Sequence, residues 1–149
     1  MMTNNQPGMT LIVKTITRLT VGVILLYGIY IVLHGHLTPG GGFAGGVIIA
    51  LSFVHLMLAF GKEVALKRFS MAAASVFESL AGLMFLTVAV LGFLGGWFFL
   101  SIYGKGEPFA LFSAHMVLLS NIAIGCKVGA GLFAVVLGML ILTKSEGKK

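Results

Sequence analysis

Charged side chains are scarce in this sequence, and their scarcity excludes a soluble globular domain. Only 9% of the 149 residues are charged, whereas 58% are hydrophobic. A soluble domain of ordinary composition carries about 25% charged residues, which it needs to cover its surface. The mean hydropathy of +1.08 agrees with this interpretation. We therefore expect an integral membrane protein.

Residues of the kind that build catalytic and metal centres are also few. The single cysteine, Cys126, lies inside an apolar run, which rules out an internal disulfide and a CxxC metal site. We interpret it as a small packing residue. His34 and His36 form an HxH pair, but no further ligand is adjacent, which argues against a metal site. Since no nucleophile–base pair or phosphate-binding loop is found either, we predict no enzyme activity, no metal and no cofactor.

Four apolar runs are long enough to cross a bilayer, since a helix of about 20 residues spans the hydrocarbon layer. They cover residues of about 11–33, 43–60, 71–100 and 113–142. No small-x-small cleavage site precedes His34, so the first run is interpreted as an uncleaved span and not as a signal peptide. The sequence thus predicts an all-α integral membrane protein whose four transmembrane helices form a single domain over residues 1–149.

Basic residues are distributed unevenly around these runs, and their distribution predicts the orientation. With four spans, one side of the membrane receives only Lys105. The other side receives Lys14, Arg18, Lys62, Lys67, Arg68, Lys144, Lys148 and Lys149. An excess of Lys and Arg marks the cytoplasmic side. We therefore predict a multi-pass protein of the cell (inner) membrane with both termini cytoplasmic, and we attribute the net charge of +6 to orientation and not to nucleic-acid binding.

The stretch 34–46 separates the first two spans. Pro39 ends a helix that arrives from its N-terminal side, and Gly40 with the glycines after it permits a tight, close-packed re-entry. We expect an outer glycine-rich loop, a second helix that begins near Phe43, and histidines that pack or hydrogen-bond at the helix end. The residues of this motif are His34, His36, Pro39, Gly40, Gly41, Gly42, Gly45 and Gly46.

Glycines four residues apart recur within the predicted spans. Gly42 with Gly46, and Gly125 with Gly129, are two such pairs. Each pair lies on one helix face and lets a neighbouring backbone approach closely. The spacing predicts helices that contact one another inside the membrane.

Lys127 lies deep in the last span, roughly 21 Å along the helix from either end. An ammonium group at this depth needs a carboxylate, carbonyl groups or water as a partner. Small or polar residues occupy both the lysine face and the roughly opposite face with Asn121, Gly125 and Gly129. We expect one face to pack inside the subunit and the other to meet a partner subunit. The sequence leaves open whether Lys127 is structural or belongs to an ion path.

Glu78 is the only acidic residue within a predicted span, and His55 lies at a similar depth if the second and third spans form an antiparallel hairpin. An imidazole beside a carboxylate could relay protons near neutral pH. The other interpretation is that each side chain reaches the membrane interface separately. Lys127, Glu78 and His55 are the predicted candidates for an ion or proton path.

Two segments resemble a known family. The run HGHLTPGGGFAGG at 34–46 and the run GCKVGAGL at 125–132 are similar to the B subunit of Mrp-type multisubunit Na⁺/H⁺ antiporters, the MnhB family. The resemblance implies a small four-helix subunit that assembles with large antiporter-like subunits and other small subunits. It implies membership of a hetero-oligomer that exchanges Na⁺ and H⁺, without independent transport by this chain. The segment around Lys127 matches the small-residue lysine helix of the family.

Other settings remain open at this point. The same subunit type occurs in membrane-bound hydrogenase and sulfane reductase complexes, where redox centres in other chains drive an ion-pumping module. A purely structural spacer that joins large subunits through its glycine faces is another interpretation. A self-sufficient exporter of the small multidrug resistance type ranks last, because such exporters use a glutamate in the first span and residues 11–33 contain no acid.

Overall fold

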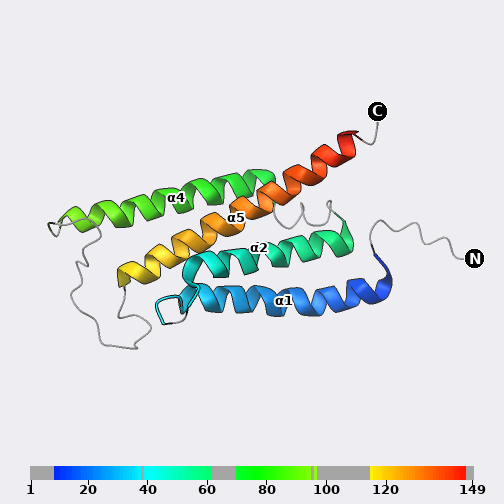
Figure 1. The fold of residues 1–149 in the computed structure, drawn as a ribbon, viewed down its shortest axis with the longest axis horizontal. Helices are drawn as coiled ribbons and strands as arrows, with labels where there is room; N and C mark the ends of the chain where they lie inside the picture. The colour runs from blue at the N-terminus through cyan, green and yellow to red at the C-terminus, as the bar shows by residue number, and fades with distance from the viewer. Residues whose placement is uncertain (1–8, 38, 62–69, 95, 97–114, 147–149) are drawn as a thin grey trace, which may run out of the picture.

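The computed structural model describes residues 9–37, 39–61, 70–94, 96 and 115–146. The described residues form four α-helices (Figure 1), which are α1 (Leu11–Leu33), α2 (Gly41–Phe60), α4 (Met71–Leu94) and α5 (His115–Glu146). Each helix contains a segment that is long and apolar enough to cross a membrane. The prediction of an all-helical chain with four candidate spans is therefore confirmed.

The helix boundaries differ from the predicted ones in physically simple ways. α2 begins at Gly41, because Gly40 takes a φ of 119° as the residue before the helix and the next two glycines fit its first turn. α5 runs on to Glu146, because hydropathy marks where a chain crosses the bilayer and not where its helix ends. α4 is described to Leu94, and its predicted continuation to residue 100 lies outside the described residues.

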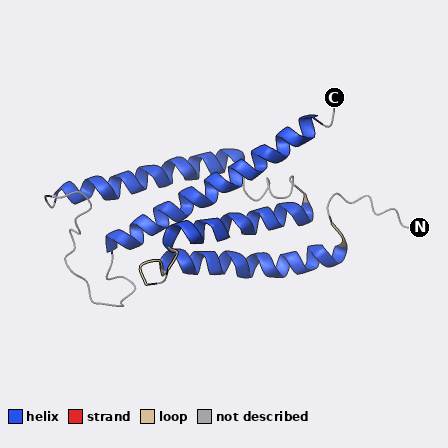
Figure 2. Ribbon diagram, viewed as in Figure 1, coloured by secondary structure: helices blue, strands red, loops and turns tan. Residues whose placement is uncertain are grey.

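The helices pack in the spatial order α1, α2, α5, α4, which differs from their order in the sequence. α2 packs against both α1 and α5, and α4 packs mainly against α5. Figure 1 shows that α1 begins and α5 ends at the same end of the bundle, and Figure 2 shows the short turn that joins α1 to α2 at the opposite end. The second and third spans therefore do not pack as a hairpin, the arrangement on which the comparison of His55 with Glu78 depended, because α5 occupies the place beside α2.

Two adjacent glycines of α2, Gly45 and Gly46, pack against two different helices. A Cβ atom on Gly45 would lie 2.5 Å from Val32 Cγ2 and 2.8 Å from the carbonyl oxygen of Gly28, both in α1. A Cβ atom on Gly46 would lie 2.7 Å from the carbonyl oxygen of Gly125 in α5. Only glycine allows backbones to approach this closely. The predicted close helix contacts are confirmed within this chain.

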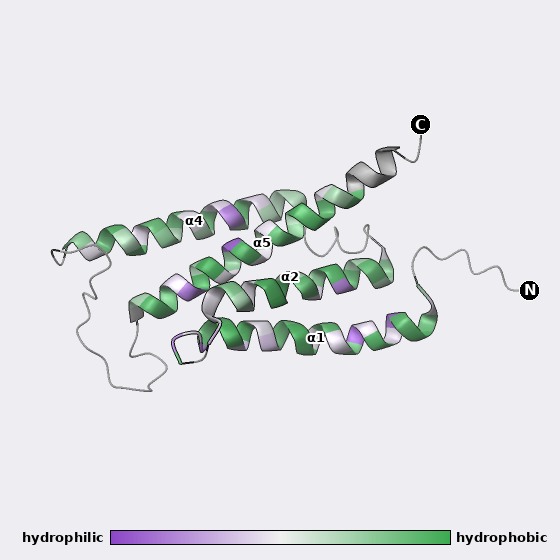
Figure 3. Cartoon of the chain, viewed as in Figure 1, coloured by the Kyte–Doolittle hydropathy of each residue, from purple (hydrophilic) through white to green (hydrophobic). Residues whose placement is uncertain are grey.

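An apolar cluster holds three of the helices together. Met57 of α2, Ala74 of α4 and Phe133 and Leu137 of α5 are buried against one another, and the Phe53 ring meets the Phe133 ring edge-on at 5.8 Å between centroids. Most other large apolar side chains point outward, so that Leu19 and Leu26 of α1 are more than two-thirds exposed. Figure 3 shows that apolar residues predominate along all four helices, and the exposed ones form an apolar exterior. Lipid or other protein must cover it.

Candidate functional site

Lys127 of α5 meets Glu78 of α4 between two candidate spans. The Lys127 Nζ atom lies 3.7 Å from Glu78 Oε1. The two helices run antiparallel, and Figure 3 shows a polar band on each of them within otherwise apolar ribbons. Of the partners that an ammonium group at this depth could use, the fold therefore supplies a carboxylate.

Small residues on both helices make room for this ion pair. A Cβ atom on Gly82 would lie 3.6 Å from Lys127 Nζ, and one on Gly131 would lie 3.9 Å from the Glu78 carboxylate. A groove of about 360 Å³ beside the pair is lined by Gly82, Phe85 and Ala123 among others. Larger side chains at these positions would fill the space through which a further group could reach the pair.

The chain itself covers the pair only in part. The side chain of Lys127 is 54% exposed and that of Glu78 is 44% exposed. The opposite face of α5 is covered, because Gly125 and Gly129 pack against Val32 and Gly46. The structure thus encloses the glycine face within the subunit, as expected, and leaves the face with the ion pair half open on the surface of the bundle.

His55 lies apart from Glu78. Its Nε2 atom is 3.3 Å from Thr17 Oγ1 and 3.3 Å from Thr20 Oγ1, both on α1. Thr20 Oγ1 donates a hydrogen bond to the Ile16 carbonyl oxygen, so it can accept one from an Nε2–H group of His55. Of the two interpretations of His55, its pairing with Glu78 is wrong, because α1 and not α4 packs against this face of α2.

The two threonines were not predicted as part of a site. Thr17 is only 1% exposed, and Thr20 follows it by three residues on the same face of α1. This spacing within an apolar run is a signal that could have identified them. The described residues therefore contain two separate polar clusters within the candidate spans, one at α4–α5 and one at α1–α2.

The glycine-rich turn closes the other end of α1. His34 ends the helix, since its backbone N–H donates to the Tyr30 carbonyl oxygen at 2.9 Å and its Nδ1 lies 3.0 Å from the same oxygen. Its ring stacks on Tyr30 with 4.0 Å between centroids. After Pro39, Gly40 and Gly41 have φ angles of 119° and 54°, which favour glycine. The expected tight re-entry is found.

Asn121 of α5 joins this turn to the rest of the bundle. The backbone N–H of Gly42 donates to Asn121 Oδ1 at 3.3 Å, which satisfies one of the N–H groups that the first turn of α2 leaves open. In the described part of the chain, Asn121 Nδ2 and both ring nitrogens of His36 are buried without a hydrogen-bond partner. Buried polar atoms are normally satisfied by protein or water. This end of the bundle is therefore more polar than the apolar middle of the four helices.

Replacing Asn121 by leucine should destabilise the α2–α5 contact. The substitution removes the acceptor for the Gly42 N–H group, and an unsatisfied buried donor costs about 1–3 kcal/mol. Thermal unfolding of the purified protein in detergent would measure this as a lower Tm. Ser120→Ala is the matched control, because the Ser120 hydroxyl bonds only to the Met116 carbonyl oxygen of its own helix. An equal loss of Tm in both variants would contradict the role of Asn121.

Among the described residues, no three His, Cys, Asp or Glu side chains gather as a ligand group. The functional groups that these helices bring together are the Lys127–Glu78 ion pair and the His55 ring with its two threonine hydroxyl partners.

Comparisons with known proteins agree on one family. Residues 12–134 match the family model described as a domain related to the MnhB subunit of Na⁺/H⁺ antiporter. An uncharacterised protein of Methanocaldococcus jannaschii is 36% identical over 74% of this chain and 44% of its own length. A Staphylococcus aureus protein that carries the provisional name antiporter subunit mnhB2 is 41% identical over 38% of this chain and 40% of its own.

A solved structure is similar over nearly the whole fold. It is a chain of the membrane-bound sulfane sulfur reductase, an archaeal respiratory membrane complex, with a TM-score of 0.77 and 34% sequence identity. The match covers 93% of the present chain and 60% of that one. The present chain thus spans less than half the length of each of the two relatives above and 60% of the length of this structural neighbour.

Proposed function

Because this chain belongs to the MnhB family, we propose that it is an accessory subunit of a multisubunit sodium/proton antiporter, in which it borders the cation or proton path. The observation that carries the proposal is the Lys127–Glu78 ion pair, which lies between two candidate spans and is half exposed on the bundle surface. In this proposal the transport itself belongs to the assembly and not to this chain alone.

The exposure of the pair favours a position at a subunit interface. An ionised side chain that faces hydrocarbon is costly, and such residues normally face a bundle interior or a water-filled cavity. About half of each side chain is left open by this chain. Another subunit would enclose the pair and complete the site. The large antiporter-like subunits and the other small subunits of an Mrp-type hetero-oligomer are the proposed partners.

The length of the ion pair favours a role in transfer. A charge-assisted N–H···O bond is about 2.7–2.9 Å long, whereas this pair is separated by 3.7 Å. Lys127 has three N–H donors, and the carboxylate of Glu78 has more than one acceptor site. Both groups therefore retain capacity to bind water, a proton or a partner side chain. A pair held this loosely beside an open groove can change partners during a transport cycle.

His55 with Thr17 and Thr20 is proposed as a second polar element that borders the path from the α1 side. The His55 ring and its two hydroxyl partners form a connected set of hydrogen-bonding groups between α1 and α2. The cluster has no direct contact with Lys127 in this chain, so a continuous route through both would need groups from other subunits. We also propose that both termini are cytoplasmic, on the basis of the Lys and Arg distribution.

A redox-driven complex is the second candidate setting, and the structural similarity to a sulfane sulfur reductase chain favours it. There, the same ion-translocating module would be driven by redox centres in other chains. Purification of the native complex and identification of its neighbouring chains by mass spectrometry distinguish the settings. Antiporter-like subunits alone would support the antiporter, and accompanying hydrogenase or reductase subunits would assign the chain to a redox complex.

Lys127→Ala should lower sodium/proton exchange, per assembled complex, by at least about tenfold, a barrier change of about 1.4 kcal/mol. The measurement uses membrane vesicles that carry the complete complex, with exchange followed by a pH-sensitive dye. Cys126→Ala is the control, because it changes an exposed neighbour on the same helix that carries no charge. If an intact Lys127→Ala complex exchanged ions at the wild-type rate, the ion-path role of Lys127 would be rejected and a purely structural spacer would remain.

A further inference from the structure

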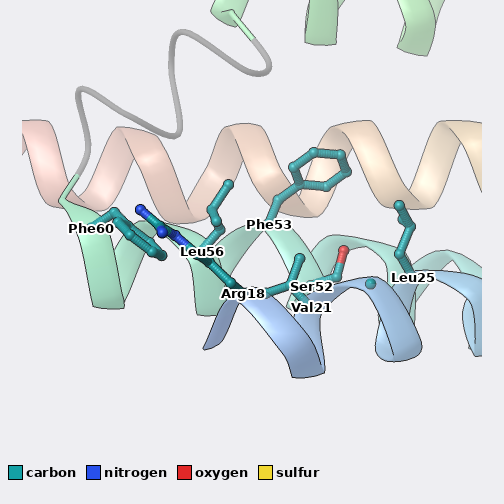
Figure 4. Close-up of a pocket in the computed structure, with 8 residues that line it drawn as sticks. Arg18, Val21, Leu25, Ser52, Phe53, Leu56 and Phe60 are labelled. Carbon is teal, nitrogen blue, oxygen red and sulfur yellow. The ribbon is translucent and has the colours of Figure 1, made fainter. Parts of the chain in front are cut away.

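A second groove lies between α1 and α2 (Figure 4), whereas the Lys127–Glu78 pair joins α4 and α5. Its volume is about 520 Å³, within the range of about 300–1,000 Å³ that small-molecule sites occupy. Apolar side chains of both helices form most of the wall, among them Leu25, Phe53 and Leu56. Since both helices are candidate membrane spans, a molecule that enters this groove comes from the bilayer.

Arg18 supplies a cation at one end of the groove. Its guanidinium carbon lies 5.3 Å from the centre of the Phe60 ring, and Figure 4 shows the two side chains together at that end. This cation–π contact orients the guanidinium group but leaves its N–H donors available. The Lys127–Glu78 pair is the ion pair found among the described residues, so Arg18 has no carboxylate partner within them.

The other polar side chain in the wall is already occupied. Ser52 is 1% exposed, and its hydroxyl donates to the Ile49 carbonyl oxygen at 2.7 Å. The groove therefore presents one cation and, beyond it, an apolar channel. Arg18 and Leu25 are seven residues apart, which is about 10 Å along a helix. This pattern is complementary to an amphiphile with an anionic head and a hydrocarbon tail.

Charge around this end of the bundle agrees with such a ligand. Lys14 lies one turn before Arg18 on α1 and adds a second basic residue near this end of the helix. Basic residues beside membrane helices attract anionic lipids, and basic pockets between helices bind their head groups. A helix of a partner subunit with an acidic side chain would also match the charge of Arg18. Such a helix would not account for the open apolar channel that continues beyond Arg18.

We propose that the groove between α1 and α2 binds an anionic phospholipid, with the phosphate on Arg18 and an acyl chain along Gly22 and Leu25. Gly22 forms the floor of the channel, since a Cβ atom there would meet no other atom within 4 Å. The inference requires only that α1 and α2 span a membrane. It does not depend on the ion path at Lys127.

The test uses the purified complex in nanodiscs doped with phosphatidylglycerol or with phosphatidylcholine, each carrying a photoreactive acyl chain. Mass spectrometry locates and quantifies the labelled residues. In the wild type, phosphatidylglycerol should label the groove at least fivefold more than phosphatidylcholine. Arg18→Gln should reduce labelling by phosphatidylglycerol to the level of phosphatidylcholine, because it removes only the cation.

Gly22→Leu should lower labelling of the groove by both lipids at least fivefold, because leucine fills the channel while Arg18 remains. Leucine is a better helix former than glycine, so the helix should be retained, and gel filtration checks that the complex stays assembled. Gly138→Leu is the matched control, since Gly138 of α5 also has open space around its Cβ position. Equal labelling of the groove by the two lipids, or unchanged labelling of Gly22→Leu, would overturn the proposal.

Discussion

The double variant Lys127→Met with Glu78→Leu should assemble into the complex as well as the wild type but should not exchange ions. Either single substitution should impair assembly as well as exchange. The reason is that a single substitution leaves one charge without its partner, at a cost on the order of 3 kcal/mol within a membrane-spanning helix. Replacing both partners by apolar residues of similar volume removes that cost.

This comparison separates the two roles that Lys127 could have. A cost of about 3 kcal/mol corresponds to roughly a hundredfold change in an equilibrium constant, so the single variants should yield far less complex in gel filtration. Exchange is then measured per assembled complex in vesicles. If the double variant exchanged ions at the wild-type rate, the pair would serve only to join α4 to α5, and the proposed ion path would be refuted.

Gly46→Leu should nearly abolish accumulation of the folded chain and of the complex. A Cβ atom at Gly46 would lie 2.7 Å from the Gly125 carbonyl oxygen and 2.9 Å from Val128 Cβ. Both atoms belong to α5, and a backbone oxygen cannot turn away as a flexible side chain can. Overpacking of a core costs about 1–3 kcal/mol even where side chains adjust, and here the helices would have to separate.

The effect of Gly46→Leu is measured as the amount of chain and complex recovered from membranes, together with the Tm of what is recovered. Gly138→Leu introduces the same side chain on α5 where nothing lies within 4 Å of its Cβ position. We expect that control to behave as the wild type. A Gly46→Leu protein with normal yield and Tm would show that α2 and α5 do not pack as described.

Much of the fold follows from the sequence because the bilayer imposes simple constraints. Crossing it requires long apolar helices, which is why α1 matches its predicted bounds. Glycine spacing indicated close contacts, but it did not indicate which helices make them. The neighbour of α2 is α5 and not α4, because Gly42 and Gly46 meet Asn121 and Gly125, a match between surfaces far apart in the sequence.

The candidate site was predictable in part for the same reason. A lysine deep in a span requires a partner, and Glu78 is the one acid within the predicted spans. Their pairing could have been deduced by elimination. Comparing depths across a hairpin left a pairing of Glu78 with His55 open, and this pairing is not found because depth does not determine which face of a helix meets which neighbour. The hydroxyl partners of His55 on α1 were missed, since threonine is common in apolar runs.

The proposed role of Lys127 and Glu78 requires another subunit to cover the face of α4 and α5 that carries them. A density map of the assembled native complex would show what lies against this face. We expect protein of a second subunit packed there, with polar groups or water beside the ion pair. Acyl chains or detergent against the same two side chains, or a chain purified from native membranes without any partner, would contradict it.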